Sequence, residues 1–169
     1  MLKIRLYGDA VLREKTGPVE KVTAAVRRLT IEMIEAMFKY VGVGLAAPQV
    51  GKNLRLAVLH HPELHPKPLI LINPEILDRG DELVSIEEGC LSLPRLNVAV
   101  ARPKDIRIRF TDVKGKLVIR EFSDLMARII QHECDHLDGK LIVDHMDLQS
   151  RLRFETAFKQ TRKHPPSSS

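Results

Sequence analysis

The segment QHECDHLDG, residues 131–139, constrains the fold of this chain more than any other feature. It places His132 and His136 four residues apart, and on an α-helix such residues lie about 40° apart around the axis and one turn along it. They continue a stripe that begins with Leu125 and Ile129. The spacing therefore predicts a helix that directs both imidazoles toward the interior of the protein.

This helix is expected between Ser123, a residue type that caps helices, and Gly139, a residue type that ends them. Apolar residues at helical spacing predict a first helix over 21–40 and a last one over 148–160. Strand patterns predominate between the first helix and the histidine segment, over 54–60, 69–73, 76–87, 97–102, 105–112 and 116–122.

We expect Pro74 to stop the strand 69–73, and the glycine-rich stretch 41–49 to be irregular or a short edge strand. The order of helix, many strands, helix and helix predicts an α+β fold with mostly antiparallel pairing. A length of 169 residues suits one domain, which we place at 1–163 with a flexible tail at 164–169.

The composition indicates a cytoplasmic globular protein. Charges throughout the N-terminus argue against a signal peptide, and no apolar run approaches the length that spans a membrane. Two cysteines do not form a disulfide scaffold, which favours a reducing compartment. The net charge of +5 permits a transient contact with the ribosome. Basic residues are dispersed and aromatic residues are few, which argues against specific nucleic-acid binding.

Two imidazoles beside the carboxylate of Glu133 are the groups that metal-assisted hydrolysis requires, although a solvated polar helix would have the same spacing. Three residues can supply a third ligand. Glu155 lies downstream, where thermolysin-like zinc proteases place a glutamate, and His145 is nearer. Cys90 lies upstream in EEGCLSLP, where its neighbours suggest a tight turn and its thiolate would be a strong ligand. Spacing alone leaves these three open.

Three segments in order resemble peptide deformylase: GVGLAAPQ at 42–49, EGCLS at 88–92 and HECDH at 132–136. The resemblance runs from about the first helix to Val143. It implies antiparallel sheets packed around a central metal-binding helix. It also implies an enzyme that removes the N-terminal formyl group from formylmethionyl nascent polypeptides and releases formate.

The resemblance implies that Cys90, His132 and His136 bind one divalent metal ion. Ferrous iron is the expected physiological ion, and zinc, nickel or cobalt can substitute for it. A Cys–His–His set is chemically compatible with each of them.

Catalytic roles follow from the same resemblance. Glu133 is expected to act as general base, accepting a proton from water and passing it to the leaving amine. The side-chain amide of Gln49 and the backbone N–H of Leu91 are expected to stabilise the oxyanion.

The substrate is expected to lie along the glycine-rich stretch as an added strand, paired with Gly42, Val43 and Gly44. Val43, Leu91 and Ile129 are expected to form the walls and floor of a methionine pocket. Leu125 follows the same stripe and is expected in the core. Some relatives carry an arginine at the position of Asn97, so Arg95 is the alternative group for holding the substrate backbone.

Neighbouring charges have expected partners as well. Glu88 and Arg102 are predicted to form an ion pair that holds the Cys90 loop. Asp135 is predicted to accept a hydrogen bond from the free N–H of a ligating imidazole or to cap a neighbouring element. Arg128 should lie at the pocket edge with its head in water. Cys134 points away from the histidines and should pack in the core, and HHPELHP at 60–66 should be a surface loop rather than a metal site.

Two other functions fit parts of the sequence. A zinc endopeptidase using His132, His136 and Glu155 would leave EGCLS and GVGLAAPQ unexplained. A basic RNA- or ribosome-binding module would make the metal ligands incidental.

Overall fold

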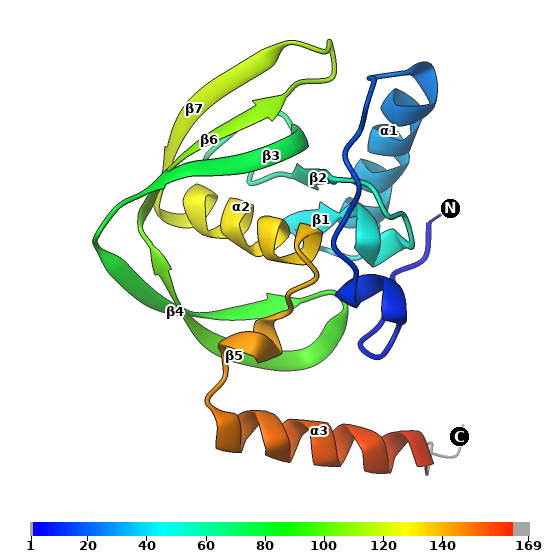
Figure 1. The fold of residues 1–169 in the computed structure, drawn as a ribbon, viewed down its shortest axis with the longest axis vertical. Coiled ribbons are helices and arrows are strands. Elements are labelled where there is room, and N and C mark those ends of the chain that lie inside the picture. The colour runs from blue at the N-terminus through cyan, green and yellow to red at the C-terminus, as the bar shows by residue number, and fades with distance from the viewer. Residues whose placement is uncertain (1, 164–169) are drawn as a thin grey trace.

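The computed structural model describes residues 2–163, and the tail predicted at 164–169 lies outside them (Figure 1). The helices are α1 (Ala24–Lys39), α2 (Asp124–Leu137) and α3 (Leu148–Lys163), with short 3-10 turns η1 (Ala10–Arg13), η2 (Ala47–Val50) and η3 (Ile142–His145). The strands are β1 (Gly44–Ala46), β2 (Leu56–Leu59), β3 (Leu69–Arg79), β4 (Leu83–Cys90), β5 (Leu93–Pro103), β6 (Asp105–Thr111) and β7 (Leu117–Ser123). None of the described helices combines the length and apolarity needed to cross a membrane.

The strands form two antiparallel sheets. One has five strands in the order β1-β2-β3-β6-β7, and the other is the β4-β5 hairpin. Helix α2 lies between them in Figure 1 and contacts β1, β2, β5, β6 and β7. The predicted α+β class with antiparallel pairing is confirmed, and the stretch 41–49 does contain a short strand, β1, at the edge of the larger sheet.

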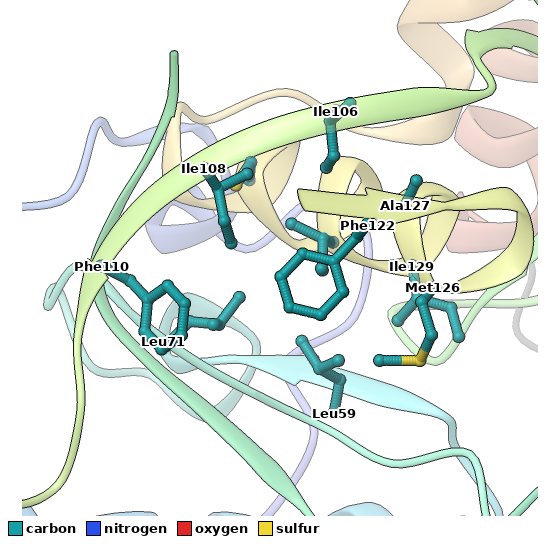
Figure 2. Packing of buried hydrophobic residues seen from close by; sticks show 11 residues of the cluster. Leu59, Leu71, Ile106, Ile108, Phe110, Phe122, Met126, Ala127 and Ile129 are labelled. Carbon is teal, nitrogen blue, oxygen red and sulfur yellow. The ribbon is translucent and has the colours of Figure 1, made fainter. Parts of the chain in front are cut away.

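One hydrophobic cluster holds α2 against the larger sheet. Alternate residues of β6 point inward, namely Ile106, Ile108 and Phe110, as expected for a strand with one buried face. Figure 2 shows them facing Phe122 of β7 and the apolar side of α2. This packing fixes which face of α2 is left to point toward the smaller sheet.

Helix α1 covers β1 and β2 through a second cluster that includes Met33, Met37, Leu45 and Val58. It begins after Thr23, whose hydroxyl accepts a hydrogen bond from the Val26 backbone, a standard N-cap. The helix predicted over 21–40 is confirmed with slightly shorter bounds.

The expectation that Pro74 stops a strand is wrong. β3 continues through Pro74 to Arg79, and the register with β6 shifts between Ile72 and Glu75. A proline within a bulge removes no ladder hydrogen bond, because the bulged residues are unpaired. The strand predicted over 76–87 is instead two strands, β3 and β4, separated by residues 80–82.

Candidate metal centre and active site

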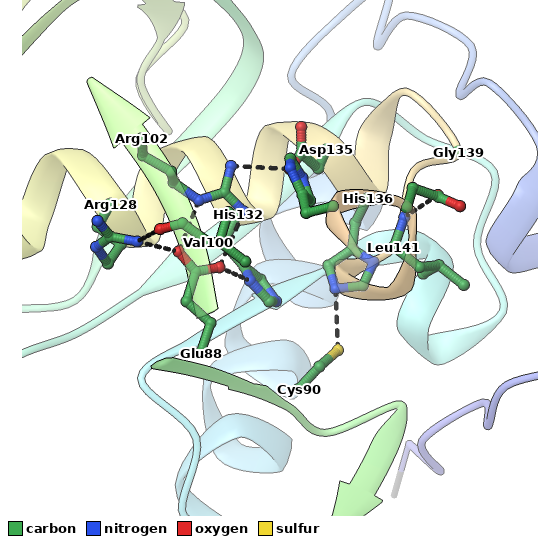
Figure 3. Close-up of polar contacts among 12 residues, drawn as sticks. Glu88, Cys90, Val100, Arg102, Arg128, His132, Asp135, His136, Gly139 and Leu141 are labelled. Atoms are coloured by element: carbon green, nitrogen blue, oxygen red, sulfur yellow. Dashed lines mark hydrogen bonds and ion pairs between the residues drawn. The ribbon is translucent and has the colours of Figure 1, made fainter. Parts of the chain in front are cut away.

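Cys90, at the end of β4, lies beside His132 and His136 of α2. One ligand atom from each residue lies within 4.8 Å of the others, and Cys90 Sγ is 3.2 Å from His136 Nε2 (Figure 3). Within residues 2–163 this is the one group of three or more histidine, cysteine or acidic residues so arranged. A thiolate and two imidazoles are donors that transition metals prefer, so the residues fit such an ion.

The other two candidates for third ligand lie elsewhere. Glu155 accepts a hydrogen bond from Arg151 on α3, at 3.1 Å. His145 Nε2 is 2.8 Å from Asp135. Neither residue belongs to the cluster, so the arrangement that a zinc endopeptidase requires is absent from residues 2–163.

Glu88 orients one of the histidines, because its Oε2 lies 2.9 Å from His132 Nδ1. This contact leaves Nε2 as the nitrogen of His132 that can coordinate. Arg102 binds the same carboxylate through two nitrogens, at 2.7 and 2.9 Å, and Arg128 binds it at 2.6 Å. The predicted pair of Glu88 and Arg102 is therefore present, within a larger buried network (Figure 3).

Burial and the contacts within this network shift the pKa values of Glu88, His132 and His136. Burial raises the pKa of Glu88, but hydrogen bonds from His132 and Arg102 outweigh it and lower that pKa to about 2. Burial, followed by the charge of His132, lowers the pKa of His136 well below its ordinary value, so this imidazole is neutral, as a ligand must be. Burial also lowers the pKa of His132, yet hydrogen bonds to Cys90 and Glu88 raise it to about 10. A cation and a proton compete for the same lone pair, so a metal ion held by His132 would displace a proton.

Three neighbouring positions differ from expectation. Asp135 does not accept a bond from a ligating imidazole but pairs with Arg102, at 2.8 Å, and with His145. The head of Arg128 is buried and donates to Glu88 and to the carbonyl of Val100 instead of reaching water. Leu125, expected in the core, is 39% exposed.

Glu133 is 3% exposed, and its Oε2 has no hydrogen-bond partner within the described part of the chain. Burial raises its pKa to about 7. A carboxylate with a free oxygen and a pKa near neutrality suits a general base. Gly44 makes room for it, since a Cβ at position 44 would lie 2.1 Å from Glu133 Oε1.

Gly44→Ala should therefore displace the Glu133 carboxylate and lower kcat by at least about tenfold, because a misplaced base transfers protons poorly. Steady-state kinetics of the variant and the wild type would measure this effect. Gly17→Ala is a matched control, because its nearest atom, Asn53 O, is 3.8 Å from the added Cβ. Equal kinetics for the two variants would contradict the close approach of Gly44 and Glu133.

Gln49 lies 2% exposed beside Cys90. Its Oε1 accepts a hydrogen bond from the Ala46 backbone at 2.8 Å. Its Nε2 donates to Ser92 Oγ at 3.2 Å and lies 3.6 Å from Cys90 Sγ. Ser92 ends the segment EGCLS, but the sequence assigned it no role; it is a fully buried serine whose position next to Gln49 depends on the turn after β4.

A cavity of about 410 Å³ connects these groups. Its lining includes Gln49, Glu133 and His132 together with every predicted substrate residue: Gly42, Val43, Gly44, Leu91 and Ile129. Arg95 and Asn97 do not line it. The glycine-rich stretch, the Cys90 loop and α2 thus form three sides of one apolar site.

Two sequence features have no part in the site. Cys134 is buried in the core between α2 and the larger sheet, where burial raises its pKa to about 12. The segment 60–66 is a surface loop, as predicted, and its histidines do not belong to the cluster of potential ligands.

Arg102→Ala should lower the free energy of unfolding by about 3 kcal/mol, because it leaves two carboxylates short of a buried partner. The side chains of Arg102 and Glu88 are only 5% and 6% exposed. Urea denaturation would measure the loss. Glu82→Gln, which breaks the exposed pair with Lys104, should leave the midpoint almost unchanged. A small effect for both variants would show that the buried network does not contribute to stability.

A buried carboxylate beside a Cys–His–His group that fits a metal ion, in an apolar cavity, is an arrangement typical of hydrolases. Residues 1–152 match the family described as polypeptide deformylase. The chain belongs to this family.

Individual relatives agree over most of the chain. It is 43% identical to a peptide deformylase of Thermotoga neapolitana, covering 90% of this chain and 91% of the relative. A peptide deformylase of Synechococcus elongatus in complex with actinonin has a TM-score of 0.86 at 36% identity, covering 94% and 86%. A Met-Ala-Ser-bound peptide deformylase of Acinetobacter baumannii has a TM-score of 0.81 at 31% identity, covering 86% and 98%.

Proposed function

We propose that this protein removes the formyl group from the N-terminus of formylmethionyl peptides, with the reaction at the end of the cavity where Glu133 meets Cys90, His132 and His136. The free Glu133 carboxylate beside three metal donors carries this proposal, because it is the arrangement that hydrolysis of an amide requires. The products are formate and a peptide with a free methionyl amine.

Cys90, His132 and His136 would hold one divalent cation, which we assign as ferrous iron, with zinc, nickel and cobalt able to replace it. The bound cation would supply Lewis acidity, which lowers the pKa of water and polarises the formyl carbonyl. The thiolate favours soft transition metals over magnesium or calcium.

The protein's own groups handle the proton and the negative charge. Glu133 accepts a proton from the attacking water and donates it to the leaving amine. The amide Nε2 of Gln49, next to Cys90, and the backbone N–H of Leu91 donate hydrogen bonds to the oxyanion.

The peptide lies in the cavity as an extended strand beside β1. This strand forms the edge of the larger sheet and, among residues 2–163, is paired with β2 alone, so its other side can accept a peptide. The methionine side chain contacts Val43, Leu91 and Ile129, which line the cavity. The relative bound to Met-Ala-Ser supports a peptide of this kind as the ligand, since that tripeptide is formyl-Met-Ala-Ser without its formyl group.

The proposed substrate class favours a location in the cytoplasm, where nascent chains emerge. The net charge of +5 supports a transient contact with the ribosome, which cosedimentation at low and moderate salt would test.

Release of formate from formyl-Met-Ala-Ser tests the proposed reaction. Protein purified without oxygen should contain one iron per chain and release formate, and a chelator should abolish the activity until a divalent metal is restored. Metal-replete protein that leaves this peptide intact would overturn the proposal.

A further inference from the structure

A chain of hydrogen bonds runs from His132 on α2 to His145 on η3. Glu88 contacts His132 at 2.9 Å, and Arg102 binds Glu88 at 2.7 and 2.9 Å. The third nitrogen of Arg102, Nη1, donates to Asp135 Oδ2 at 2.8 Å. The same oxygen lies 2.8 Å from His145 Nε2, so the chain ends at this histidine.

The chain passes from buried to accessible groups. The side chains of Glu88 and Arg102 are 6% and 5% exposed, whereas those of Asp135 and His145 are 21% and 30% exposed. Arg102, Asp135 and His145 line a second, polar cavity of about 350 Å³, which shares none of its lining with the catalytic cavity. His145 therefore reaches the metal group only through other residues.

Arg102 is the residue through which a change at His145 would alter the position of Glu88. All three of its side-chain nitrogens are bonded, two to Glu88 and one to Asp135. A guanidinium is planar, so the direction of the Asp135 bond fixes the plane in which Glu88 is held. Glu88 in turn sets the orientation of the His132 ring.

His145 is well placed to hold Asp135 firmly. It ends η3, where Ile142 and Val143 are buried against β5. Asp144 in the same turn accepts a hydrogen bond from the Leu141 backbone and pairs with Arg13. The backbone that carries the imidazole is thus anchored from two sides.

We propose that His145 is a positioning residue for the metal centre, acting through Asp135, Arg102 and Glu88 to orient His132. The inference rests on the proposed function, because it requires a cation at Cys90, His132 and His136. His145 touches neither the substrate nor the ion.

A matched pair of substitutions tests this role. His145→Gln keeps an N–H donor at about the same reach, whereas His145→Met keeps the length and removes the donor. His145→Met should weaken cobalt binding by about threefold to tenfold, a smaller loss than for residues that bond directly to a metal ligand. It should also alter the absorption of the cobalt–thiolate site and lower kcat with KM little changed. His145→Gln should keep cobalt affinity, absorption and kcat close to those of the wild type. His65→Ala, on the surface loop, should match the wild type in all three.

A double-mutant cycle separates this role from a general loss of packing. If His145 acts through Asp135, His145→Met should have little further effect on cobalt affinity in an Asp135→Ala background. Equal cobalt affinity for His145→Met and the wild type would overturn the inference, as would a full effect in the Asp135→Ala background. Wild-type protein that binds no cobalt and releases no formate would overturn the proposed function as well, whereas active wild type with unchanged His145→Met would overturn this inference alone.

Discussion

Cys90→Ala should eliminate stable metal binding and, with it, the release of formate. The thiolate is the one anionic donor of the cluster, and its removal leaves two imidazoles on one helix. Loss of an outer contact to a metal ligand already weakens metal affinity by about 10- to 100-fold, so loss of the ligand itself should exceed about 100-fold. Metal content after gel filtration and formate release from formyl-Met-Ala-Ser would measure both effects.

The chain offers two matched controls for this substitution. Cys134→Ala removes the other cysteine, which is buried in the core, and should keep the metal and the activity. Glu155→Ala should also keep both, because Glu155 pairs with Arg151 on α3. Metal loss in Glu155→Ala with retention in Cys90→Ala would instead support the zinc endopeptidase arrangement.

Glu133→Gln should lower kcat by about 10²- to 10⁴-fold, the range over which a positioned acid–base group accelerates proton transfer. The amide keeps the shape of the side chain but cannot accept the proton of water. Metal content should stay at the wild-type level, because Glu133 does not belong to the donor cluster. Single-turnover kinetics on metal-replete protein would measure the chemical step.

Stability distinguishes this loss from unfolding. Glu133 is buried with one oxygen unpartnered, and burial already raises its pKa to about 7. A neutral amide should therefore leave the unfolding midpoint at or above that of the wild type at pH 8, where the carboxylate is ionised. Glu121→Gln, at an exposed position of β7, should change neither kcat nor the unfolding midpoint. An active Glu133→Gln enzyme would exclude Glu133 as the base.

Local periodicity was sufficient to predict much of the fold. Helix α2 and the adjacent imidazoles follow from the four-residue spacing, and β6 follows from its alternating pattern. The third metal ligand does not follow from spacing, since Cys90 lies on β4 of the smaller sheet and not on α2. Only the resemblance of three segments chose it over Glu155 and His145.

Contacts between distant segments explain the remaining differences. A helical position gives the direction of a side chain but not its neighbours, so Arg128 was expected in water although Glu88 and a β5 carbonyl bind it. The same limitation hid the bond from His132 to Glu88, which depends on how the hairpin packs against α2. The bulge near Pro74 depends on tertiary packing, which local sequence does not reveal, so the proline predicted the end of a strand.

The proposed docking of the peptide on the edge of β1 restricts when the enzyme can act. A peptide that pairs with a strand edge must have backbone N–H and C=O groups that are not already hydrogen-bonded. An N-terminus that is already helical or paired within a sheet has no such free groups. With the peptide docked as proposed, removal of the formyl group must precede the folding of the first residues of each new polypeptide, and proteins whose N-termini fold early should retain the group most often.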